Sequence, residues 1–182
     1  MNLPNKITMF RVVLIPFFVF FMLSEHIAYH NYIAVAIFIV ASLTDMLDGK
    51  IARKYNLVSN FGKFMDPLAD KLLVSSAMIC FVALPSNPMP AWVVIVIIAR
   101  EFIISGFRLV ASDAGVVIAA SYWGKIKTVT QMIMSILLIV NFEGYIINIV
   151  EYVFIYAALI LTVISLVDYM VKNWSVMRDG NM

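Results

Sequence analysis

The sequence predicts an all-α membrane protein with six transmembrane helices and both termini in the cytoplasm. Its composition is the first observation: of 182 residues, 63% are hydrophobic and 13% charged, and the mean hydropathy of +0.97 is far above that of soluble domains. Second, polar breaks divide the chain into six apolar segments, each near the roughly 20 residues that span a bilayer. Third, Lys and Arg gather beside alternate breaks, as they do in cytoplasmic loops.

The first segment, roughly residues 7–24, follows a basic N-terminus but has no small-residue cleavage site, so we expect a retained helix rather than a signal peptide. The later breaks contain turn formers and helix breakers, for example PSNPMP and NFEGY. They separate five further helices, expected at roughly 31–53, 62–84, 89–111, 121–141 and 146–171. Because no repeat or linker divides the chain, residues 1–182 are expected to form a single domain.

The distribution of positive charge predicts the orientation of these helices. The breaks SEHIAYHN, PSNPMP and NFEGY contain no Lys or Arg, and all 13 cations flank the other breaks or the two ends of the chain. Six spans with cytoplasmic termini follow from this pattern. The net charge of +2 gives no reason to expect nucleic acid as a partner, and the single cysteine, Cys80, excludes a disulfide within the chain.

Four aspartates lie where the second helix ends and the third begins. Asp45 and Asp48 are three residues apart, and Asp66 and Asp70 are four apart, so each pair occupies one helix face. The short break between the helices lets these faces meet, and we expect the four carboxylates to converge in one pocket on the cytoplasmic side. Such a cluster in a membrane protein needs compensating charge.

Hard divalent cations are the compensation that this cluster predicts. Ligand sets made of oxygen alone favour Mg²⁺, Mn²⁺ or Ca²⁺ over zinc, and two ions bridged by carboxylates suit displacement at phosphorus. Gly49 and Gly62 leave room for a bulky ligand, and Arg53, one turn after Gly49, is placed to pair with a phosphate. The alternative is structural: the aspartates form salt bridges with neighbouring Lys and Arg residues or cap helix ends.

A pattern around the aspartates resembles the signature of the CDP-alcohol phosphatidyltransferase family: Asp45-x2-Asp48-Gly49-x2-Ala52-Arg53-x8-Gly62-x3-Asp66-x3-Asp70. Members of that family are six-helix membrane enzymes, generally homodimeric, that use an alcohol to displace CMP from a CDP-linked lipid or alcohol. The resemblance implies one such domain with Mg²⁺ or Mn²⁺ as cofactor, two ions being expected. Metal would be bound by the following residues: Asp45, Asp48, Asp66 and Asp70.

The same resemblance implies roles for individual residues. Asp70 would be the catalytic general base as well as a metal ligand. The CDP-lipid would be bound at four signature positions: Gly49, Ala52, Arg53 and Gly62. Thr8, at the start of the first helix, is a further candidate that would face the nucleotide, with helix capping by this stretch as the alternative.

Three further stretches, NLPNKITMFRVVLIPFF, IIAREFIISGFR and GKIKTVTQM, resemble the family members that join CDP-diacylglycerol to sn-glycerol 3-phosphate. That resemblance implies transfer of a phosphatidyl group to glycerol 3-phosphate, giving phosphatidylglycerophosphate and CMP. It also implies a multi-pass protein of the cell membrane whose active site faces the cytoplasm. Its partners would be the two substrates, the lipid bilayer and a second copy of the chain.

Glycerol 3-phosphate brings a second phosphate, which needs cations outside the aspartate cluster. We expect Arg108 with Lys125 or Lys127 to bind this phosphate, and Arg100 with Glu101 to shape the cavity around it. The alternative for these residues is ordinary positive-inside topology with a structural Arg/Glu pair.

Other functions stay open at this point. The nearest alternatives keep the chemistry and change the acceptor to serine, inositol phosphate or phosphatidylglycerol. A divalent-cation transporter would use the aspartates as a permeation site, but the acids lie toward one end of their helices rather than midway. A structural membrane scaffold would leave the four carboxylates unexplained.

Overall fold

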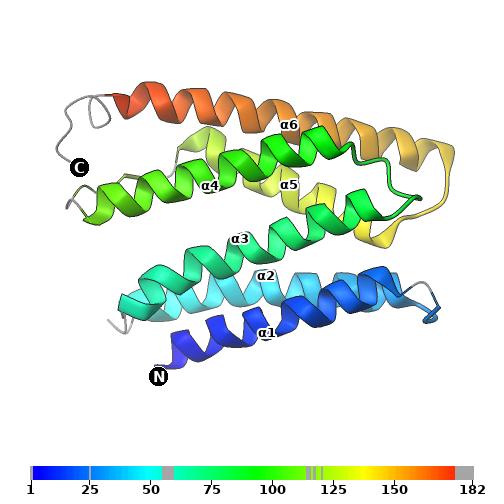
Figure 1. Ribbon diagram of the computed structural model, residues 1–182, viewed down its shortest axis with the longest axis horizontal. Coiled ribbons are helices and arrows are strands. Elements are labelled where there is room, and N and C mark those ends of the chain that lie inside the picture. The colour runs from blue at the N-terminus through cyan, green and yellow to red at the C-terminus, as the bar shows by residue number, and fades with distance from the viewer. Residues whose placement is uncertain are drawn as a thin grey trace. The chain divides into compact units, whose positions relative to one another are not determined.

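The computed structural model describes residues 2–24, 26–54, 60–113, 116, 118–119 and 121–174, with side chains at all of these except 45–54, 60–61, 63–64 and 113. Within that part of the chain the protein has six helices and no strand, so the all-α prediction is confirmed (Figure 1). The helices are α1 (Leu3–Leu23), α2 (His30–Lys54), α3 (Asn60–Ala83), α4 (Ala91–Asp113), α5 (Tyr122–Val140) and α6 (Tyr145–Lys172).

The helix ends lie within a few residues of those predicted from hydropathy, with one larger difference at α1. That helix begins at Leu3, four residues before the expected start. Pro4 is in its first turn, where proline has a suitable φ angle and its missing N–H would have no helical acceptor. An apolar criterion excludes this polar first turn, although it is helical.

The chain divides into two compact units, and the first comprises Met1–Asn87 with Ile139–Asn141. In it α1 packs against both α2 and α3. The buried face of α1 contains Ile15, Phe18 and Met22, and Phe18 contacts Phe38 of α2 with ring centroids 5.8 Å apart. Further toward its N-terminus the same face becomes polar, with buried Asn5, Thr8 and Arg11.

The second unit comprises Pro88–Leu138 and Phe142–Met182, which contain α4, α6 and nearly all of α5. α4 packs against α6, and Phe107 meets Tyr169 edge to face with ring centroids 5.8 Å apart. The buried face of α6 mixes small, apolar and polar side chains: Glu151, Ile155, Ala158, Thr162, Ser165 and Tyr169. The single domain expected over residues 1–182 stays a prediction.

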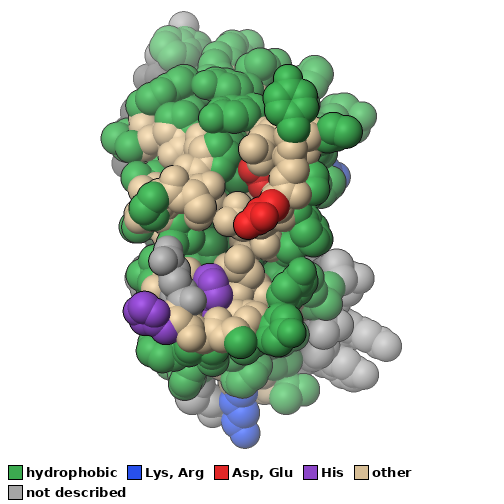
Figure 2. Space-filling model, turned by 90° about the vertical axis from the view of Figure 1, so that its right-hand side faces the viewer, with side chains coloured by type: hydrophobic (Ala, Val, Ile, Leu, Met, Phe, Trp, Pro, Cys, Tyr) green, Lys and Arg blue, Asp and Glu red, His purple; other side chains and the backbone are tan. Residues whose placement is uncertain are grey.

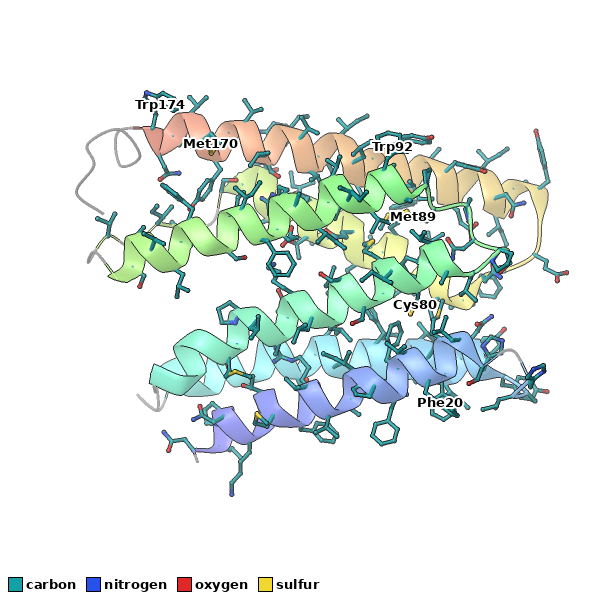
Figure 3. The ribbon with its side chains drawn as sticks, viewed as in Figure 1. Phe20, Cys80, Met89, Trp92, Met170 and Trp174 are labelled. Atoms are coloured by element: carbon teal, nitrogen blue, oxygen red, sulfur yellow. The ribbon has the colours of Figure 1, made fainter. Side chains whose placement is uncertain are left out.

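Within the described residues three helices, α1, α5 and α6, are long and apolar enough to cross a membrane. α4 is of similar length but contains Arg100, Glu101 and Arg108. Large hydrophobic side chains are exposed along the helices, and they cover much of the face seen in Figure 2. Phe20, for instance, is 56% exposed on the outer side of α1 (Figure 3). These are the features of a membrane protein.

Candidate active site

Two of the four predicted ligands, Asp66 and Asp70, lie in the first three turns of α3. Both carboxylates are half-buried, and their spacing of four residues places them on one face of the helix. Gly62, one turn earlier, is buried. The expected pair on α3 is therefore present as a partly accessible acidic face.

Asp66 is tied to α1 by a hydrogen bond. The Thr8 hydroxyl donates to Asp66 Oδ1 over 2.6 Å, and Thr8 itself is fully buried. The same hydroxyl lies 3.1 Å from the carbonyl oxygen of Pro4, the acceptor one turn earlier in its own helix. α1 therefore contributes directly to the surroundings of the α3 carboxylates.

The antiparallel pairing of α1 with α2 brings the end of α2 to the same place. Phe18 contacts Phe38, so ten residues back along α1 and ten forward along α2 lead to Thr8 and Asp48 at about the same level. All signature residues of α2 are within this helix, but their side chains lie outside the described part of the structure: Asp45, Asp48, Gly49, Ala52 and Arg53.

Asp70 has a neighbouring cation. Lys71 Nζ lies 3.2 Å from Asp70 Oδ2, and both side chains are partly accessible. A half-exposed ion pair of this kind contributes about 1 kcal/mol or less to stability. It leaves the Asp70 carboxylate free to exchange partners, as a group that accepts a proton must.

Among the described side chains no three His, Cys, Asp or Glu residues form a metal-binding group. Asp66 and Asp70 by themselves supply oxygen donors one turn apart, the ligand type that Mg²⁺ and Mn²⁺ prefer. The α3 face thus fits one side of a hard-cation site. The side chains of the other two predicted ligands, Asp45 and Asp48, lie outside the described residues.

A second polar cluster occupies the interior of the α4–α6 unit. Glu101 Oε1 accepts from Arg100 Nη1 over 3.0 Å and from Lys127 Nζ of α5, and all three side chains are buried. The Arg108 guanidinium interacts electrostatically with the Tyr169 hydroxyl. Arg108 Nε is buried and has no hydrogen-bond acceptor within the described residues.

This second cluster has more positive than negative charge. Glu101 pairs with two of its cations, Arg100 and Lys127, and no carboxylate is paired with Arg108 among the described residues. On α6, Asp168 is paired with Lys172 at 2.7 Å. A buried cation without an anion is strongly unfavourable, so this interior suits an anionic ligand.

Of the four residues expected at the acceptor phosphate, three belong to this cluster and one does not. Arg100, Arg108 and Lys127 are buried or half-buried, whereas Lys125 is exposed. Tyr169 was missed from the sequence because an aromatic residue at the end of an apolar helix is typical of a membrane interface. The polar positions Asn5, Thr8 and Arg11 at helical spacing in α1 were visible, but their burial was not.

A hollow of about 500 Å³ at the end of α6 is a less suitable site. It is lined by Leu166, Val167, Met170, Val171 and Trp174, two of which are labelled in Figure 3. None of these side chains can bind a hard cation, accept a proton as a base or neutralise a phosphate. The chemistry therefore belongs to the charged clusters.

Comparison with known proteins decides the family. A family model described as CDP-alcohol phosphatidyltransferase matches residues 1–164. The chain belongs to the CDP-alcohol phosphatidyltransferase family. Residues 1–164 include the whole aspartate signature and both charged clusters except for Tyr169 and the Asp168–Lys172 pair.

Curated relatives match the chain over nearly its whole length. It is 45% identical to the CDP-diacylglycerol–glycerol-3-phosphate 3-phosphatidyltransferase of Bacillus subtilis over 99% of both chains. It is 39% identical to the protein of the same name from Haemophilus influenzae, over 93% of this chain and 91% of the relative. A Rickettsia felis protein of that name is 36% identical over 92% and 93%. This membrane protein is thus a phosphatidyltransferase by family.

Proposed function

We propose that the chain transfers a phosphatidyl group from CDP-diacylglycerol to sn-glycerol 3-phosphate, giving phosphatidylglycerophosphate and CMP. One observation carries this proposal: relatives that share this activity in their names are 36–45% identical over at least 92% of the chain. The cluster of Arg100, Arg108 and Lys127 around Glu101 in the α4–α6 unit supports an acceptor that carries its own phosphate.

We assign metal binding to Asp45, Asp48, Asp66 and Asp70, with Mg²⁺ or Mn²⁺ as the ions and two ions in the site. The oxygen donors of Asp66 and Asp70 support this assignment. When bound, the metals would neutralise the diphosphate of the CDP-lipid and the charge that develops during transfer. We assign the CDP moiety to residues beside these ligands: Gly49, Ala52, Arg53 and Gly62. Thr8, the further candidate from the sequence, donates a hydrogen bond to Asp66.

Asp70 is the proposed general base. A hydroxyl oxygen of glycerol 3-phosphate forms a bond to the lipid-linked phosphorus of CDP-diacylglycerol, and the phosphoanhydride bond to CMP breaks. CMP leaves with the bridging oxygen and the electron pair of that bond. The hydroxyl proton passes to the Asp70 carboxylate, which is partly accessible and held only by Lys71 within the described structure.

For the acceptor phosphate, Arg108 is the principal candidate. Lys127 and Arg100 already bind Glu101, so we assign them to the positive surroundings of the phosphate rather than to its main contact. Arg108 has a donor without a partner among the described residues and a neighbouring hydroxyl on Tyr169. Lys125 is exposed and lies two residues before Lys127 on α5, and it is retained as a candidate.

The membrane arrangement that we propose has six spans, cytoplasmic termini and an active site facing the cytoplasm from the cell membrane. It is supported by the six helices, by the alternation of Lys and Arg along the chain and by exposed tryptophans near helix ends. We also propose a homodimer, because members of the family are generally homodimeric.

An acceptor panel tests the proposed function. Purified protein is given CDP-diacylglycerol, Mg²⁺ and one acceptor at a time: glycerol 3-phosphate, serine, inositol phosphate or phosphatidylglycerol. We expect CMP release and phosphatidylglycerophosphate with glycerol 3-phosphate alone, and no release with any acceptor from the Asp70→Asn variant. CMP release with serine but not with glycerol 3-phosphate would refute the assignment, and metal flux into liposomes without a nucleotide lipid would indicate a transporter.

A further inference from the structure

We propose that Thr8 is a positioning residue that orients the Asp66 carboxylate for metal binding, an inference that rests on the proposed metal role of Asp66. Thr8 would then act through Asp66 and not through contact with the nucleotide. The juxtaposition that carries this inference is the hydrogen bond from Thr8 Oγ1 to Asp66 Oδ1, which joins residues 58 positions apart in the chain.

The direction of the hydrogen bond follows from its geometry. A hydroxyl has one proton, and among the described acceptors two compete for it: Pro4 O at 3.1 Å and Asp66 Oδ1 at 2.6 Å. The carboxylate is closer, and a bond to an ionised acceptor is shorter and roughly twice as strong as a neutral one. Of these two acceptors, Asp66 is therefore the one that mainly receives the proton.

The Thr8 side chain is held before any ligand arrives. Threonine in a helix favours rotamers that bring its hydroxyl near the carbonyl one turn earlier, and Thr8 has this conformation. The same rotamer points the hydroxyl at Asp66. Because Thr8 is fully buried, its neighbours prevent it from turning away.

This arrangement has a direct consequence for metal binding. The bond to Oδ1 fixes the plane of the Asp66 carboxylate, and no hydrogen bond to Oδ2 is found in the described part of the chain. The lone pairs of Oδ2 therefore remain for a cation. Groups that orient metal ligands in this way typically change metal affinity or activity by about 10- to 100-fold when removed.

Thr8 belongs to a buried polar face at the N-terminal end of α1. The buried polar residues of α1 are Asn5, Thr8 and Arg11. Later in the helix, the buried face is apolar, with Ile15, Phe18 and Met22. A buried polar face at one end of an otherwise apolar helix indicates that it faces polar groups on its neighbours. Thr8 supplies the contact that the structure shows directly.

The test compares the metal affinity of three variants with that of the wild type. Thr8→Val removes the hydroxyl and keeps the branched shape, Thr8→Ser keeps the hydroxyl, and Thr162→Val is the matched control. Thr162 is also fully buried and also bonds the carbonyl one turn earlier, at 2.6 Å from Ala158 O, but it contacts no aspartate in the described structure. The readout is Mn²⁺ titration of purified protein, followed by electron paramagnetic resonance without substrate.

We expect Thr8→Val to weaken Mn²⁺ binding by about 10- to 100-fold, and Thr8→Ser and Thr162→Val to bind as the wild type does. In the Asp66→Asn background, Thr8→Val should have no further effect. Activity of Thr8→Val should recover as Mg²⁺ is raised, with the KM for CDP-diacylglycerol at saturating metal unchanged. If Thr8→Val fails to fold, as judged by its elution profile and melting temperature, Thr8→Ala is read by the same criteria.

Wild-type Mn²⁺ affinity in Thr8→Val would overturn the proposal. So would a raised KM for CDP-diacylglycerol at saturating metal with Mn²⁺ affinity unchanged, which would indicate a nucleotide contact instead. Failure of the acceptor panel would reject the proposed acceptor, while the metal titration would still measure the role of Thr8. The two failures are therefore distinguishable.

Discussion

At the scale of single residues, the protein buries charge in a way that needs a ligand. Glu101 serves two cations at once, Arg100 and Lys127, so neither is an independent donor. Arg108 is different because no carboxylate is paired with it among the described residues, whereas Arg100 is paired with Glu101. The acceptor phosphate is therefore expected to depend on Arg108 more than on the other cations.

Replacing Arg108 tests this ranking. We expect Arg108→Ala to raise the KM for glycerol 3-phosphate by roughly 10- to 100-fold, because a hydrogen bond to a charged group contributes about 1.5–3 kcal/mol. The KM for CDP-diacylglycerol should be unchanged. Steady-state kinetics with each substrate varied in turn provide the measurement.

Lys125→Ala is the matched control for the loss of a cation. Lys125 is exposed, so its removal should change the KM for glycerol 3-phosphate much less. An unaltered KM in Arg108→Ala, with a large rise in Lys125→Ala, would reverse the assignment.

At the scale of the helices, α1 has two different faces and two different tasks. Its inner face begins with polar residues, of which Thr8 bonds Asp66 of α3, and continues with apolar residues such as Phe18 that pack on α2. Its outer face exposes large side chains, such as Phe10 and Phe20. The same helix therefore shapes a polar site at one end and provides a lipid-facing surface along its length.

Two phenylalanines of α1 test the distinction between these faces. Phe18 is fully buried against Phe38, whereas Phe20 is 56% exposed. We expect Phe18→Ala to destabilise the protein by about 3–5 kcal/mol through the cavity that it leaves, and Phe20→Ala to have a small effect. Thermal unfolding in a mild detergent compares the two variants. Equal melting temperatures would contradict the inward orientation of Phe18.

At the scale of the whole molecule, the proposed topology makes the links between helices alternate between the two sides of the membrane. Ser86 lies in the link between α3 and α4, and Glu143 in the link between α5 and α6, and both are exposed. Lys172 ends α6. The Lys and Arg distribution predicts that the first two lie outside the cell and the third in the cytoplasm.

Cysteine labelling in intact cells tests this topology. In a Cys80→Ala background, Ser86→Cys and Glu143→Cys should react with a membrane-impermeant thiol reagent added outside. Lys172→Cys should react only after the membrane is permeabilised. Reaction of Lys172→Cys from outside would refute cytoplasmic placement of the C-terminal end.

The helices were predictable because the signal for each is local. Apolar runs and the breaks between them lie within one helix length, so the sequence located all six to within a few residues, except for the polar first turn of α1. The signature residues Asp66 and Asp70 could also be predicted, because their spacing in the sequence is sufficient to place them on one helix face. Asp45 and Asp48 follow the same logic, although their side chains lie outside the described structure.

The sequence by itself therefore determined the helices, the family resemblance and the identity of the carboxylates. Only the tertiary structure showed that Thr8 donates a hydrogen bond to Asp66. It also showed that Lys127, which we expected to bind a phosphate, pairs with Glu101. These pairs join residues 58 and 26 positions apart. Such contacts depend on how each helix is rotated and offset against its neighbour, which is set by the packing of whole faces and not by any local pattern.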